Sequence, residues 1–203
     1  MKKSILAFTL VALIPLSNAF AEGVKVGVIT GATGPGASLG IPYKNTFEVV
    51  PKTLGGVPVE YIIVDDATDT TTSVKLARKL IQQDNVDLII GSSSVPTALA
   101  VSEIVAEQKV PQISLSPLPV KAEDNPWSYA VPQPINIMMA AVVKNMKEKG
   151  VKSVGYLGFS DSWGELVLAG LKANIEGTDI KLVASERYGR IDTSVAGQVL
   201  KLM

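Results

Sequence analysis

The sequence predicts an α/β protein with two lobes, each built on a parallel sheet that helices cover on both faces. Three observations support this prediction. Short apolar runs alternate with segments of helical periodicity. Strands that alternate with helices imply right-handed crossovers and therefore parallel sheets. A proline-rich segment, 116–134, divides these units into two groups and is typical of a crossover between lobes rather than a new core element.

The composition excludes several kinds of chemistry. The chain has 203 residues, 47% of them apolar, with no Cys, no His and a formal net charge of zero. Without Cys and His there is no thiol nucleophile, no thiolate metal site and no Ser-His-Asp triad. A nucleic-acid partner would need a clustered basic excess, which is absent from this sequence. We therefore expect no cofactor, no metal and no nucleic-acid partner.

Residues 1–21 are predicted to be a secretory signal peptide. The basic pair Lys2-Lys3 precedes an apolar run over 5–16, and Ala19-Phe20-Ala21 forms an A-x-A cleavage site. The run is too short to span a bilayer, and no second apolar stretch reaches the roughly 20 residues that a span needs. An uncleaved anchor is the alternative. We expect a mature protein that starts at residue 22, lies in the periplasm and has no stable membrane insertion.

Residues 22–131 are expected to form the N-terminal lobe, without its C-terminal return. The first strand is followed by a glycine-rich loop over 30–36, and Gly55-Gly56 closes the next segment. Apolar runs predict the strands, and helical spacing predicts the helices. The expected strands are 24–29, 59–64, 88–90 and 110–115, and the expected helices cover 43–54 and begin at Thr72 and Thr97.

Residues 132–203 are expected to form part of a second lobe. A helix from Ile135 to about Gly150, a strand over 154–159, a helix opened by 160–164, a strand over 181–185 and a helix near Val195 follow in order. Two open strands are too few for a typical covered parallel sheet. We therefore expect the sequence to be a fragment of a longer protein.

Three consecutive serines, Ser92-Ser93-Ser94, follow the buried strand 88–90 and precede a helix. Gly91 permits a sharp turn, Ser94 can cap the helix, and Pro96 fits its first turn. Free N–H groups and the helix dipole favour an anion at such a helix start. The turn is predicted to hold the carboxylate of a small ligand. An ordinary strand-to-helix turn with a good cap is the alternative.

Several polar loops follow predicted strands and should gather at one edge of the sheet. They are the glycine-rich loop, Asp65-Asp66, the serine turn and the segment 114–117. Ligands of open parallel sheets bind beyond the carboxyl ends of the strands. Asp65-Asp66 is interpreted as a strand-end turn with an Asx-type cap, rather than as a metal site or an acid–base pair.

The glycine-rich loop also invites comparison with dinucleotide-binding loops. Thr30-Gly31-Ala32-Thr33-Gly34 follows the first strand, but Ala37 stands where a third glycine would be needed. No tyrosine has a lysine four residues further on, so the Tyr-x-x-x-Lys pair of short-chain dehydrogenases is missing. These two departures argue against an oxidoreductase with a dinucleotide-type fold.

Short motifs in a specific order extend over nearly all of the mature segment. The motifs are Lys25-Val26-Gly27-Val28, Thr33-Gly34-Pro35, Leu39-Gly40, Asp65-Asp66-Ala67-Thr68-Asp69, Ala77-Arg78-Lys79-Leu80, Ile89-Ile90-Gly91-Ser92-Ser93-Ser94, Lys109-Val110-Pro111 and Gly158-Phe159-Ser160-Asp161. In these motifs the chain resembles the branched-chain-amino-acid-type periplasmic substrate-binding proteins of ABC transporters. The resemblance implies two α/β lobes of the type 1 periplasmic-binding fold that close over a ligand and then engage a membrane permease.

The resemblance also implies site residues. It assigns the ligand carboxylate to the serine turn, further contacts to the loop after the fourth strand, an apolar wall to the first loop and an aromatic lid to the second lobe. Val95 and Leu118 stand where the family has ligand-binding hydroxyls, which leaves open which serine acts. The implied ligand-binding residues are Ser92, Ser93, Ser94, Ser116, Pro117, Leu118, Leu39 and Trp163.

The predicted function is capture of a small carboxylate between two lobes and its delivery to an ABC importer, without catalysis. The family's acidic partner for a ligand amino group falls beyond Met203, so an amino acid and an aromatic or aliphatic acid both remain open. A ligand-sensing lobe for a receptor and an exported enzyme are the alternative functions.

Overall fold

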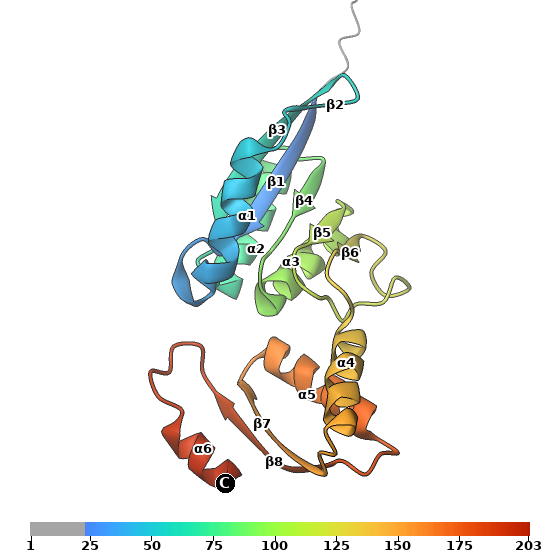
Figure 1. Ribbon diagram of the computed structural model, residues 1–203. Coiled ribbons are helices and arrows are strands. Elements are labelled where there is room, and N and C mark those ends of the chain that lie inside the picture. Colours follow the sequence, from blue (N-terminus) through green and yellow to red (C-terminus); the bar gives the residue numbers. More distant parts are fainter. Residues whose placement is uncertain (1–22) are drawn as a thin grey trace, which may run out of the picture.

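The computed structural model describes residues 23–203 (Figure 1). The predicted signal peptide, 1–21, lies outside these residues and stays a prediction. No helix within the described range combines the length and the apolar character that a bilayer crossing needs. The chain forms two α/β units, each with its own sheet, which lie one above the other in the figure and are joined by the segment before α4.

The first sheet has six strands in the order β2-β3-β1-β4-β5-β6. All neighbours are parallel except the β2–β3 pair. The central strand β1 places Val28 beside Ile63 on one side and beside Ile90 on the other. The strands are β1 (Val24–Thr30), β2 (Thr53–Leu54), β3 (Val57–Asp65), β4 (Leu88–Ile90), β5 (Gln112–Ser114) and β6 (Ser128–Ala130).

Helices cover both faces of this sheet, as the sequence predicts. The helices α2 (Thr70–Gln82) and α3 (Val95–Gln108) pack on one face, where Ile29, Leu80 and Val101 are fully buried. The helix α1 (Ala37–Val49) lies over the other face, and its Phe47 packs against the cluster around Val28. The apolar strand residues are thus buried from two sides, which is why their sequence reads as continuous apolar runs.

The second unit is built around two parallel strands, β7 (Ser153–Phe159) and β8 (Lys181–Tyr188). Its core gathers Val143, Tyr156, Leu168, Leu171, Ile175 and Ile180. The remaining elements are α4 (Ile135–Glu148), α5 (Ser162–Ile175) and α6 (Ala196–Leu202). The prediction of an α/β fold with parallel sheets is confirmed, whereas the division into lobes at residue 131 stays a prediction.

The first helix begins earlier than predicted. The expected range was 43–54, but a short 3₁₀ turn, η1 (Gly34–Gly36), leads directly into α1 at Ala37, and Pro42 lies inside that helix. The end of the predicted helix is instead the strand β2, which turns into β3 through Gly55 and Gly56 at φ values of 57° and 85°. Positive φ at both central residues suits a tight hairpin turn.

The proline-rich segment 116–134 contains a strand that the sequence interpretation missed. The strand β6 pairs with β5, and the backbone N–H of Gln112 donates to the carbonyl of Trp127 at 2.7 Å. The Trp127 ring packs against the first core cluster. The expectation that this segment adds no core element is therefore wrong, although the segment does join the two units. The strand is short and Tyr129 on it is 60% exposed, so no apolar run marks it.

Candidate ligand-binding cleft

A buried carboxylate anchors the serine turn to the sheet. Asp66 is fully buried; its Oδ2 accepts hydrogen bonds from Ser73 Oγ at 2.8 Å and from Ser92 Oγ at 2.6 Å. Its Oδ1 accepts from the backbone N–H of Thr68 at 2.9 Å. Asp65 accepts from the N–H of Ala67 in the same way. The interpretation of Asp65-Asp66 as an Asx-type turn is confirmed.

Ser92 lies at the centre of this network. Its hydroxyl donates to Asp66, and its oxygen accepts from the N–H of Ser93 at 2.6 Å and from Thr97 Oγ1 at 2.9 Å. The residue is fully buried. The hydroxyl of Ser92 therefore holds the turn in shape and does not reach the surface of the cleft.

The hydroxyls of Ser93 and Ser94 do not bond Asp66, unlike that of Ser92. Ser93 Oγ accepts from the N–H of Gly31 at 3.0 Å, which leaves its own O–H to donate. Ser94 occupies the N-cap of α3, as predicted, but its hydroxyl bonds Thr97 Oγ1 at 2.7 Å instead of capping a backbone N–H. The N–H of Val95 has no acceptor within the helix, because the first N–H groups of a helix lack one.

A cavity of about 260 Å³ lies between the two units, and both contribute to it. Most of the predicted site residues line it, namely Leu39, Ser93, Ser94, Ser116, Pro117 and Trp163. Ser92 and Leu118 are not among its lining residues. The others are Tyr43, Val95, Leu115, Phe159 and Arg190, which the sequence interpretation did not assign to a site.

The early start of α1 explains why Tyr43 belongs to the cleft. Leu39 and Tyr43 are four residues apart, so they lie on the same face of the helix. The hydroxyl of Tyr43 donates to the carbonyl of Leu115 at 3.4 Å, in the loop after β5. If the sequence interpretation had started the helix at Ala37, it would have placed Tyr43 on the same helix face as Leu39.

The second unit contributes an aromatic and cationic wall. Asp161 caps α5: its Oδ1 accepts from the N–H of Trp163 at 2.9 Å and from that of Gly164 at 3.1 Å. Its Oδ2 accepts from Arg190 Nε at 2.5 Å. The Arg190 guanidinium lies 4.3 Å from the centre of the Phe159 ring. Since Arg190 follows β8, the carboxyl-edge rule applied to the second sheet could have found it.

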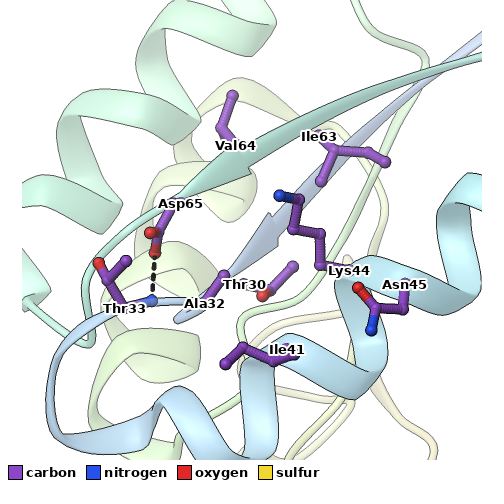
Figure 2. Close-up of a pocket in the computed structure, with 9 residues that line it drawn as sticks. All are labelled: Thr30, Ala32, Thr33, Ile41, Lys44, Asn45, Ile63, Val64 and Asp65. Atoms are coloured by element: carbon purple, nitrogen blue, oxygen red, sulfur yellow. Dashed lines mark hydrogen bonds between the residues drawn. The ribbon is translucent and has the colours of Figure 1, made fainter.

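A second cavity, of about 290 Å³, lies inside the first unit beside α1. Figure 2 shows the residues that line it. Asp65 Oδ1 accepts from the N–H of Thr33 at 3.2 Å, and Thr30 Oγ1 donates to the carbonyl of Gly40 at 2.9 Å. Partial burial acts to raise the pKa of Asp65, but bonds from Ala67 and Thr33 outweigh it and hold this pKa below its ordinary value. These polar atoms already bond the protein itself, so they stabilise the loop after β1.

Fold and cleft together define a two-lobed α/β protein of the type 1 periplasmic-binding kind. A family model described as periplasmic binding protein matches residues 23–203, and the chain belongs to this family. The resemblance predicted from the sequence motifs is thereby confirmed. Among curated relatives, Leu/Ile/Val-binding protein homolog 6 of Brucella abortus is 29% identical over 170 residues, which are 76% of this chain and 41% of the relative.

Solved structures agree. An extracellular ligand-binding receptor from Rhodopseudomonas palustris HaA2 is 46% identical with a TM-score of 0.86, over 89% of this chain and 51% of its own. A solute-binding protein of an R. palustris ABC transporter, in complex with 4-hydroxybenzoate, is 26% identical with a TM-score of 0.76, over 89% and 50%. The chain thus spans about half the length of these relatives, or less. The expectation that it is a fragment stays a prediction.

Proposed function

We propose that this chain belongs to an extracytoplasmic solute-binding protein, which captures a small carboxylate between its lobes and delivers it to the permease of an ABC importer. The observation that carries the proposal is the cavity between the two units. One side presents the serine turn and the start of α3, and the other presents aromatic rings. The family membership and the relatives' descriptions support binding rather than catalysis. Location in the periplasm, after removal of a signal peptide, belongs to the same proposal.

The carboxylate is assigned to the first unit. Ser93 carries a hydroxyl that is free to donate, and the N–H of Val95, the first residue of α3, has no acceptor within the helix. The helix dipole adds favourable potential for an anion at this end. Ser92 supports the site through Asp66 rather than touching the ligand. This assignment favours Ser93 among the three serines.

The apolar walls suit the body of the ligand. Leu39 and Tyr43 on α1 face the same cavity as Phe159 and Trp163 from the second unit. Its volume of about 260 Å³ lies just below the range of roughly 300–1,000 Å³ for ligand sites, which favours a small molecule. Branched aliphatic and aromatic acids both fit this description. A relative named Leu/Ile/Val-binding protein homolog 6 and a solved solute-binding protein in complex with 4-hydroxybenzoate support the same two classes.

Calorimetric titration of the purified native protein with leucine, benzoate and 4-hydroxybenzoate tests the proposal. Replacing Ser93 and Ser94 together by alanine is expected to weaken the binding of the preferred acid by about 1–3 kcal/mol, because a buried carboxylate loses its donors. Ser102→Ala is the matched control, since Ser102 is a buried serine of α3 whose hydroxyl bonds the Leu99 carbonyl. Equal affinities in the double variant and the wild type would reject the serine-turn site.

A further inference from the structure

Within residues 23–203, Arg190 is the one charged residue that lines the cavity between the two units. It lies in the segment after β8, which rises towards the first unit (Figure 1). The carboxylate site proposed above uses hydroxyl and N–H groups of the first unit. Arg190 therefore supplies the cleft with donors that the proposed function leaves unassigned.

The guanidinium is held in place before any ligand arrives. Its Nε donates to Asp161 Oδ2 at 2.5 Å, and its face lies over the Phe159 ring. The side chains of Arg190 and Asp161 are only 20% and 21% exposed. Asp161 is fixed in turn by the N–H groups of Trp163 and Gly164. A planar guanidinium fixed by an ion pair and an aromatic face loses little freedom when it binds an acceptor.

Most of its donors remain for a ligand. A guanidinium carries five N–H groups, and the one hydrogen bond from this side chain to another side chain within residues 23–203 uses Nε. The two Nη groups can form parallel bonds to one acceptor group. Because Asp161 already balances the charge of Arg190, a neutral hydroxyl or carbonyl suits these donors as well as a carboxylate does.

Resting on the proposed function, we propose that Arg190 recognises a second hydrogen-bond acceptor of the ligand, opposite the carboxylate bound at the serine turn. The ligand class is then a small acid with an apolar body and polar groups at both ends. Such a molecule bonds the first unit through one end and the second unit through the other. The second acceptor thereby sets specificity and joins the two lobes in the closed state.

Two matched ligand pairs test this on the native protein by calorimetry, namely benzoate with 4-hydroxybenzoate and hexanoate with adipate. In the pair that binds, the acid with the second acceptor is expected to bind at least about tenfold more tightly than its partner. Arg190→Gln is expected to abolish this preference, so that the two acids of the pair bind with affinities within about twofold of each other. Arg187→Gln is the matched control, because Arg187 also pairs with a carboxylate and lies over an aromatic ring but does not line the cavity.

The outcomes separate the two proposals. A preference that persists in Arg190→Gln would overturn the role of Arg190, and so would an equal loss for both acids of a pair. If Arg190→Gln does not fold, Arg190→Lys carries the test, since it keeps the ion pair with Asp161 but lacks the fork; an unchanged preference would then reject the proposal. If the simple acid binds the Ser93 and Ser94 double variant as tightly as the wild type, the carboxylate site is rejected instead. Binding by neither pair would reject the proposal for Arg190, whereas the carboxylate site is judged by the titrations with leucine, benzoate and 4-hydroxybenzoate.

Discussion

Replacing Asp66 with alanine is expected to lower the free energy of unfolding of the first unit by about 3–5 kcal/mol. The side chain is fully buried and accepts three hydrogen bonds, from Ser73, Ser92 and Thr68. A hydrogen bond to a charged group contributes about 1.5–3 kcal/mol. Ser73 Oγ also bonds the carbonyl of Asp69 at 2.8 Å, so it keeps an acceptor when Asp66 is replaced. Ser92 Oγ and the N–H of Thr68 lose their sole acceptor. Removing a buried carboxylate also removes its desolvation cost, which keeps the loss below the full sum.

Urea unfolding followed by Trp127 fluorescence measures this loss, because the Trp127 ring packs against the first core cluster. A Trp163→Phe background removes the second tryptophan of the chain from the signal. Asp69→Ala is the matched control, since Asp69 caps α2 from an exposed position through the N–H of Thr72. Loss of an N-cap costs about 0.5–2 kcal/mol. A loss in Asp66→Ala no larger than in Asp69→Ala would refute the anchoring role of Asp66.

Three further predictions follow from the same geometry. Trp163→Ala is expected to weaken ligand binding about 10–100-fold by removing apolar surface from the cleft, as calorimetry would measure; unchanged affinity would exclude a lid role. Gly164→Ala is expected to cost about 1–3 kcal/mol in thermal unfolding, because its methyl group would meet the Phe159 carbonyl, and a neutral effect would contradict this packing. The pKa of Asp65 is lowered in the fold, so its ionised form stabilises the protein above the ordinary value of 3.8, and this contribution disappears as pH falls through the lowered value. Unfolding of Asp65→Asn between about pH 2 and 5 should therefore depend less on pH than that of the wild type, and equal slopes would disprove the shift.

Continuous apolar runs made the central strands predictable. The strand β4 covers Leu88–Ile90, as the sequence indicates, because its side chains meet helices on both faces of the sheet. The strands β2 and β6 have no such pattern. Their pairing depends on partners elsewhere, such as the bond from Ser128 Oγ to Gln112 Oε1 at 2.8 Å, and a local pattern does not show such a partner.

The start of α1 could not be predicted, because its residues are not typical of a helix. Gly36, Gly40 and Pro42 are typical of a loop, yet they lie at or inside the first turns of the helix. Gly40 is required there, because a methyl group would overlap the Gly31 carbonyl. Close packing against the loop after β1 therefore decides the helix start, and that packing is a tertiary contact.

The rule that ligands bind at the carboxyl ends of parallel strands predicted the serine turn and Ser116, whereas Trp163 was predicted from the family resemblance. It did not separate Ser92 from Ser93, because the bond of Ser92 to Asp66 joins residues 26 apart in the chain. Arg190 depends in the same way on Asp161, 29 residues earlier. Hydroxyls and charges of the same type take different roles according to such long-range partners.

The central claim, ligand capture between the two units, is tested most directly through the fluorescence of Trp163. A Trp127→Phe variant of the native protein leaves Trp163 as the reporter, and Trp163 lines the cavity. Titration with the preferred acid should change its emission along a saturable curve, with the same dissociation constant as calorimetry. A heat of binding without any change in Trp163 emission would place the ligand elsewhere and contradict the account.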